Sequence, residues 1–175
     1  MKIVVGLGNL GGQYDATRHN VGFWVVDRLV EQYADLPAWD QRYRSLWMRC
    51  RLNQEPVGVM KPKTFMNASG DAVLAAMTGL KIKPDSFLIV YDDFDLPLGS
   101  CRYRQSGSGG SHNGMRSIVA KVGPMVPRLR IGIGPKPSEW TTTGFVLGAF
   151  SQPEQAILDG LWDEVHQKIT DWLSQ

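Results

Sequence analysis

The chain has 175 residues, of which 43% are hydrophobic and 21% are charged, values that are ordinary for a folded globular protein of one domain. It contains no run of about 18 apolar residues and no basic, apolar leader, so we expect neither a membrane span nor a secretion signal, but a cytoplasmic protein. The net charge is only +2, and Cys50 and Cys101 are too isolated for a disulfide framework or a CxxC metal site.

The first predicted element is a short buried strand over residues 3–5, followed by a glycine-rich turn over residues 6–12. The turn contains the spacing GxGxxG, which also occurs in dinucleotide-binding proteins. That fingerprint requires a helix at the third glycine and an acidic residue after a second strand about 20 residues later, and neither is present. A nicotinamide-dependent oxidoreductase is therefore disfavoured. Asn9 and His19 lie between this strand and a helix predicted over residues 23–33.

The next two segments are predicted strands. Residues 41–52 mix arginines with large apolar residues, as a strand with one wet face does, and residues 56–60 are apolar up to a proline that ends the ladder. Residues 71–80 follow as a predicted helix. Asn67 therefore lies after a strand and before a helix.

Residues 87–91 (FLIVY) form the clearest buried strand, predicted to end at Asp92. Functional groups of open α/β sheets lie beyond the carboxyl ends of the strands. We therefore expect Asn9, Asn67 and Asp92 to lie at one edge of a sheet.

A loop with four glycines, residues 105–114, comes next and leads into a predicted helix over residues 115–122. It is either a flexible linker or a backbone brought close to an anionic ligand at a helix N-terminus, where His112 and Asn113 lie. Residues 128–134 are a predicted strand. We call residues 135–148 the flap, because they are predicted to form a mobile loop. A packing helix is predicted from Ser151 onward.

Positive charge is concentrated between residues 102 and 136, which contain no Asp or Glu. Such a segment either faces a polyanion or is a solvated surface balanced by acids elsewhere, and charge alone leaves both open.

Three kinds of enzyme are disfavoured because the chain lacks their motifs: GxSxG of serine hydrolases, HExxH of zinc peptidases and the P-loop of nucleotide hydrolases. A histidine can take a proton from water when a carboxylate holds its other ring nitrogen, and Asp92 is the candidate partner of His19. Carboxamides of Asn9, Asn67 and Asn113 can hold a substrate carbonyl. For any one of these residues taken alone, capping of a loop is the simpler role. Their convergence favours hydrolysis of an ester.

Long blocks of the sequence resemble the signatures of bacterial peptidyl-tRNA hydrolases, in the same order: GLGNLGGQYDATRHNVG, KPKTFMNASG, DDFDLPLG and GSGGSHNGMRS, followed by RLRIGIG. The resemblance covers Lys2 to about Phe150. It implies one α/β domain over residues 1–175, with a twisted mixed sheet between helices. It also implies a monomer, without cofactor, metal or obligate protein partner, that cleaves the ester between peptide and tRNA.

The resemblance also implies roles for individual residues. His19 is the expected general base and Asp92 its partner, while Asn9 is expected to discriminate N-blocked peptidyl-tRNA. The expected substrate-binding residues are Tyr14, Phe65, Met66, Asn67, His112 and Asn113, with Arg104 and Arg130 on the tRNA 5′-phosphate.

Two positions depart from the family pattern, which usually has Pro at Leu10 and Gly at Ser111. Both are expected to alter rate or fit without abolishing activity. Some relatives of the family bind RNA as splicing factors, so an RNA-binding module without catalysis is the alternative, and the complete set of polar site residues argues against it.

Overall fold

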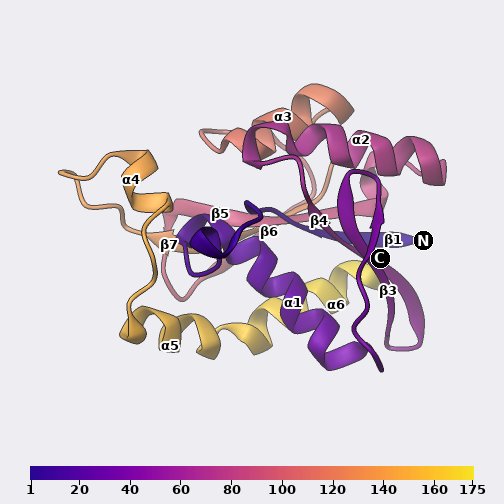
Figure 1. Ribbon diagram of the computed structural model, residues 1–175, viewed down its shortest axis with the longest axis horizontal. Helices are drawn as coiled ribbons and strands as arrows, with labels where there is room; N and C mark the ends of the chain where they lie inside the picture. Colours follow the sequence, from indigo (N-terminus) through magenta and orange to yellow (C-terminus); the bar gives the residue numbers. More distant parts are fainter.

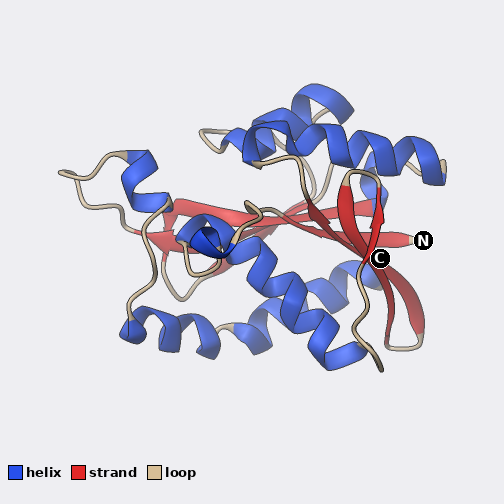
Figure 2. Cartoon of the chain, viewed as in Figure 1, coloured by secondary structure: helices blue, strands red, loops and turns tan.

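A seven-stranded β-sheet divides the molecule into two layers of helices, and the structure, a computed structural model, describes residues 1–175 (Figures 1 and 2). The strands are β1 (Lys2–Gly6), β2 (Asp40–Arg42), β3 (Ser45–Leu52), β4 (Glu55–Pro62), β5 (Phe87–Pro97), β6 (Cys101–Arg104) and β7 (Arg128–Gly134). The helices are α1 (Val21–Tyr33), α2 (Ser69–Leu80), α3 (Asn113–Val122), α4 (Thr142–Val146), α5 (Gln152–Gly160) and α6 (Trp162–Leu173). Four 3-10 turns complete the chain: η1 (Gly12–Tyr14), η2 (Arg18–Asn20), η3 (Met66–Ala68) and η4 (Pro84–Ser86).

The sheet is mixed, with strand order β2-β3-β4-β1-β5-β7-β6. Its centre is parallel, because β1 pairs with β4 and β5, and β5 pairs with β7. Strands β2, β3 and β6 join antiparallel at the two sides. The predicted α/β fold, with a mixed sheet between helices, is confirmed. None of the helices has both the length and the apolar character needed to cross a membrane.

Each face of the sheet has its own apolar core. A cluster of 25 buried residues packs α1, α5 and α6 on one face, and a cluster of 15 packs α2 and α3 on the other (Figure 1). Successive residues of β1 alternate between the clusters: Val4 belongs to the first, while Ile3 and Val5 belong to the second. Burial on both faces explains why the central strands are apolar at every position.

Strand β5 runs further than the sequence predicted. The apolar run ends at Tyr91, but the strand continues through Asp92 to Pro97. It continues because β7 goes on pairing with it, with Asp92 opposite Ile131 and a register shift before Pro97. Asp92 is thus held within a strand and not in a loop.

Three further segments differ from the predictions. Residues 41–52 form a hairpin and not one strand, because Tyr43 and Arg44 adopt positive φ angles of 53° and 54° between β2 and β3. The C-terminal helical pattern is broken after Gly160 into α5 and α6. The flap contains the short helix α4, whose N-cap Thr141 accepts a hydrogen bond from Gly144 N at 3.0 Å.

The first helix lies unusually close to the sheet, because two glycines face each other. A Cβ atom on Gly22 would collide with the carbonyl of Val90 and the backbone of Leu7, and one on Gly6 would collide with Gly22. This contact brings the N-terminus of α1, and the turn η2 before it, onto the ends of β1 and β5.

Candidate active site

The turn η2 and the loop after β1 are fastened to each other by one side chain. Asn20 accepts a hydrogen bond from the backbone N–H of Asn9 at 2.8 Å and donates to its carbonyl at 2.9 Å. The side chain of Asn9 in turn accepts from the N–H of Met66 at 2.9 Å. Because the Oδ1 atom of Asn9 takes this bond, its amide nitrogen remains as the donor end of the side chain. Asn20 was not assigned a role from the sequence, although it adjoins His19.

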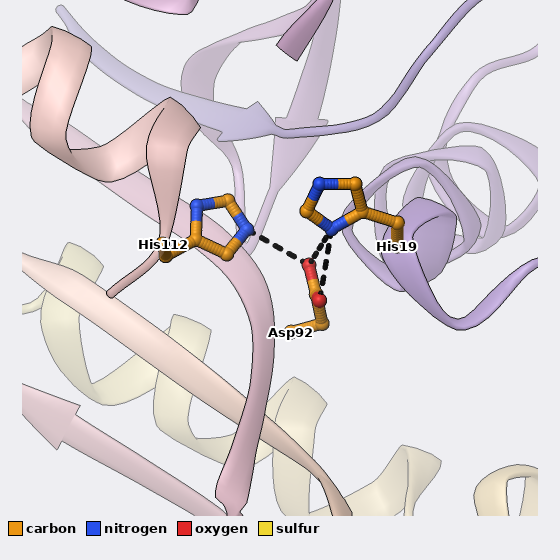
Figure 3. A group of neighbouring side chains, drawn as sticks. All are labelled: His19, Asp92 and His112. Carbon is orange, nitrogen blue, oxygen red and sulfur yellow. Dashed lines mark hydrogen bonds and ion pairs between the residues drawn. The ribbon is translucent and has the colours of Figure 1, made fainter. Parts of the chain in front are cut away.

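His19 and Asp92 are in direct contact although 73 positions separate them in the chain, as the sequence predicted (Figure 3). The Nδ1 atom of His19 lies 3.0 Å from Oδ1 and 2.9 Å from Oδ2 of Asp92. The carboxylate is only 3% exposed. An ionised carboxylate only accepts hydrogen bonds, so the proton of His19 lies on Nδ1 and the opposite nitrogen, Nε2, is left without one.

A second imidazole holds the same carboxylate. The Nε2 atom of His112 lies 2.9 Å from Oδ1 of Asp92, the oxygen that His19 also contacts, and the two imidazole rings are 5.0 Å apart (Figure 3). The Nδ1 atom of His112 accepts the backbone N–H of Met115 at 3.1 Å and so carries no proton. The hydrogen bonds therefore assign the His112 proton to Nε2, from which it is donated to Asp92.

Asp92 is held in its charged form by these two donors. Burial by itself raises the pKa of a carboxyl group, but electrostatic attraction and hydrogen bonds from His112, and then from His19, hold the Asp92 pKa well below its ordinary value. The three side chains also bring three potential metal-ligand atoms within 4.8 Å of one another. Both nitrogens turned toward Asp92 carry protons, however, so the cluster is arranged as a hydrogen-bond array and not as a metal centre.

The cluster opens into a cavity of about 490 Å³. Its wall includes His19, Asn9 and most of the predicted substrate-binding residues: Phe65, Met66, Asn67, His112 and Asn113. Phe65 is 62% exposed and has a positive φ of 57°, a strained conformation for an aromatic residue. Tyr14 lies in η1 and is not among the lining residues.

The cavity wall also contains charged side chains, arginines from β6 and β7 and aspartates from β5. Arg104 and Arg130, the two predicted phosphate contacts, both line the cavity. Arg130 already has a partner, because its Nη1 atom lies 3.0 Å from Asp93 Oδ2, while its buried Nε has none. Arg128, on the same strand as Arg130, is only 1% exposed.

The glycine-rich loop is held by Arg128. This guanidinium donates to the carbonyls of Gly107 at 2.9 Å, Ser108 at 2.6 Å and Pro124 at 3.1 Å. The segment is thus an ordered wall of the cavity and not a flexible linker. Sequence reasoning missed this role because an arginine in an alternating strand has the same pattern whether it faces water or a buried loop.

Arg18, next to His19, connects η2 to the flap and to α5. It donates to the carbonyl of Phe145 at 3.2 Å and to the two oxygens of Glu154 at 3.0 and 3.3 Å. Its guanidinium lies 4.5 Å from the Phe145 ring. A short backbone bridge pairs Thr17 with Ala149 beside it. Because flap residues 142–143 and 146–147 line the cavity, one wall of the site is fixed to the segment that carries His19.

Comparison with known proteins identifies this arrangement. Residues 3–175 match the family described as Peptidyl-tRNA hydrolase. The chain belongs to the peptidyl-tRNA hydrolase family. A peptidyl-tRNA hydrolase of Nitratidesulfovibrio vulgaris is 44% identical over 183 residues, covering 99% of this chain and 90% of the relative. One of Synechococcus is 45% identical over 160 residues, covering 91% and 71%.

Solved structures of peptidyl-tRNA hydrolases share the fold. The crystal structure from Acinetobacter baumannii matches with a TM-score of 0.90 and 37% identity over 97% of this chain and 87% of that one. A complex of a peptidyl-tRNA hydrolase with N-propanol matches with a TM-score of 0.92 and 36% identity, covering 99% and 89%. These relatives give no support to the alternative of a non-catalytic RNA-binding module.

The two departures from the peptidyl-tRNA hydrolase pattern lie at different places. Ser111 is exposed and lines the cavity next to His112. Leu10 lies outside it, on the wall of a separate hollow beside Phe23 and Lys61. Of the two, only Ser111 adds a side chain to the cavity that holds the cluster.

Proposed function

We propose that the protein hydrolyses the ester between the peptide and the 3′-terminal ribose of peptidyl-tRNA, with His19 as general base. The unprotonated Nε2 of His19 takes a proton from water as the water oxygen attacks the ester carbonyl carbon. When the tetrahedral intermediate collapses, the C–O bond to the ribose breaks and the same proton passes to the ribose oxygen. The products are a free tRNA hydroxyl and a peptide carboxylic acid, which releases its remaining proton to water and becomes a carboxylate.

The observation that carries this proposal is the contact of His19 Nδ1 with the buried Asp92, 2.9 Å apart at the end of a cavity. The carboxylate fixes the ring in the orientation that leaves Nε2 as the basic nitrogen, and it stabilises the imidazolium that forms. Turnover then requires a water molecule within hydrogen-bond reach of His19 Nε2 and next to the substrate carbonyl carbon.

Carboxamides supply the donors that hold the carbonyl. Asn9, whose oxygen accepts the N–H of Met66, has its amide N–H groups free to donate to a ligand. With Asn67 and Asn113, which line the same cavity, it stabilises the negative charge that develops on the carbonyl oxygen. Asn9 also favours peptides whose N-terminus is blocked, because the carbonyl of the blocking amide can accept its second N–H, whereas a free ammonium has no acceptor.

The tRNA end extends along the rest of the cavity. The exposed ring of Phe65 is a stacking surface for the terminal base, with Met66 beneath it, and Arg104 and Arg130 contact phosphate. Tyr14 is proposed as a more distant contact. We assign His112 to the reaction centre and not to tRNA, because both its ring nitrogens are engaged. The protein is proposed to act in the cytoplasm as a monomer, without a cofactor.

The test is an assay on N-acetylaminoacyl-tRNA with EDTA present. The His19→Ala variant is expected to lose roughly 10²–10⁴-fold in turnover, as is typical when a general base is removed. His166→Ala serves as the control, since His166 lies on α6 stacked against Tyr33 and away from the cavity. Full activity of His19→Ala would refute the proposed role of His19.

A further inference from the structure

Asp92 accepts hydrogen bonds from two imidazole rings, although a single ring suffices to orient a general base (Figure 3). We propose that His112 is a positioning residue for the reaction: its Nε2–H shares the Asp92 carboxylate with His19 and so limits how strongly that carboxylate retains a proton on His19. The inference rests on the proposed function, because it assigns His112 a task in the cycle of that base.

The position of His112 supports this role. It is the N-cap residue of α3, and its Nδ1 atom accepts the N–H of Met115 at 3.1 Å. Asn, Asp, Ser and Thr are the usual residues at an N-cap, because a short side-chain oxygen is enough for this bond. Histidine has what those residues lack, a second nitrogen, Nε2, on the far side of the same imidazole ring. That nitrogen is the one 2.9 Å from Asp92.

The cap also fixes the direction of the His112 proton. A backbone N–H donated to Nδ1 requires Nδ1 to be bare, so the proton is on Nε2 and points to the carboxylate. The positive end of the α3 dipole lies behind the same ring. The helix terminus, the ring and the carboxylate therefore form a line of hydrogen bonds that draws negative charge away from His19.

The consequence for catalysis is a balance. If the Asp92 carboxylate bonded to His19 alone, it would stabilise the His19 imidazolium more strongly, and neutral His19 would form again only at higher pH. Sharing the charge leaves His19 unprotonated over a wider range, while Asp92 still fixes its orientation. The side chains of Asp92 and His112 are 2% and 9% exposed, so water competes little with these bonds.

No other charged group shares the Asp92 carboxylate, because its side-chain hydrogen bonds and ion pairs are made only with the two histidines. The ring of Tyr91 lies 4.8 Å from that of His112, and the ring of His19 lies 5.0 Å from it. The titratable and charged residues around the cluster are Arg18 from η2, Tyr91, Asp93 and Asp95 from β5, Arg104 from β6, and Arg128 and Arg130 from β7.

Two substitutions separate the two nitrogens of His112. His112→Asn places an oxygen near the position of Nδ1, so it retains the helix cap and removes the donor to Asp92. His112→Gln places its amide N–H near the position of Nε2, so it retains the donor and weakens the cap. The measurement is the pH dependence of kcat/KM for both variants and the unaltered protein, together with their melting temperatures.

We expect the acid limb of His112→Asn to move to higher pH by about half to one unit, with a drop of roughly tenfold on the plateau. His112→Gln is expected to keep its acid limb near that of the unaltered protein and to melt at a lower temperature. Coincident acid limbs for all three proteins, a shift to lower pH, or equal shifts in both variants would overturn the inference. Failure of the proposed function is seen separately, as activity retained in His19→Ala.

The assignment is also testable without any variant. Nitrogen-15 NMR of the labelled protein distinguishes the two neutral forms of a histidine ring. His112 is expected to carry its proton on Nε2 and to show a bare Nδ1 at neutral pH. A proton on Nδ1 would overturn the inference even if both variants failed to fold.

Discussion

Replacement of Arg18 by lysine tests whether Arg18 fixes the position of the flap relative to His19. Arginine makes two bonds to Glu154, one to the carbonyl of Phe145 and a stacked contact with the Phe145 ring. Lysine is a single point charge on a flexible stem and retains at best one of the bonds. The guanidinium side chain is only 8% exposed, although the Glu154 side chain is 28% exposed, so screening by water is partial.

The expected loss follows from these contacts. Two charge-assisted hydrogen bonds and the stacking amount to about 3 kcal/mol after discounting for the exposure of Glu154. For a protein of this size, that is a fall in melting temperature of roughly 6–12 °C. Because the flap lines the cavity, its displacement would shift the groups that hold the substrate. We therefore expect kcat/KM, measured well below the melting temperature, to fall about 10–100-fold, since small displacements of reacting groups have effects of this size.

The assays are thermal unfolding followed by circular dichroism and hydrolysis of N-acetylaminoacyl-tRNA at 20 °C. Arg28→Lys is the matched control, because Arg28 also reaches α5, with Asp159 at 3.6 Å, but lies on α1 outside the cavity. Its effect on both readouts is expected to be small. If Arg18→Lys changed the melting temperature by less than about 2 °C and left kcat/KM intact, the proposed coupling of flap and base would be wrong.

The remaining predictions concern charge. Arg104→Ala is expected to weaken tRNA binding and to reduce the slope of log affinity against log salt by about one, as loss of one phosphate contact does, whereas Arg51→Ala on β3 leaves the slope unchanged; equal slopes for both would contradict the phosphate role. For Glu154, burial raises the pKa, but hydrogen bonds from Ser151 and the charge of Arg18 outweigh it and lower the pKa below its ordinary 4.5. The resulting stabilisation is full above pH 4.5 and is lost as pH falls through the lowered value, so urea midpoints of Glu154→Gln and the unaltered protein should converge in acid; a constant gap would rule this out.

The sequence predicted most of the layered architecture, because each central strand is a short apolar run with polar residues at its end. The same reasoning brought His19 and Asp92 to one edge of the sheet, since β1 and β5 are parallel neighbours. What it missed depends on pairing between distant segments. The extension of β5 beyond Asp92 depends on its pairing with β7, and the local sequence DDFDLP has no pattern that predicts it.

The sequence also could not identify buried arginines. Arg18 and Arg128 look like surface cations in the sequence, yet both are buried and both donate hydrogen bonds to backbone carbonyls. Their partners lie in glycine-rich loops and the flap, whose conformations have no periodic signal. The hydrogen bond from His112 to Asp92 was equally invisible, because only the cap at α3 fixes which nitrogen faces the carboxylate.

The anchoring of Arg18 by Glu154 has a consequence during synthesis. While a ribosome is making this protein, the growing chain is itself joined to a tRNA by the type of ester that the finished enzyme cleaves. The residues that hold η2 in place are translated long after it, because 127 positions separate Arg18 from Phe145 and 136 separate it from Glu154. A nascent chain that has not yet reached Glu154 therefore lacks the ion pair that braces the turn beside His19.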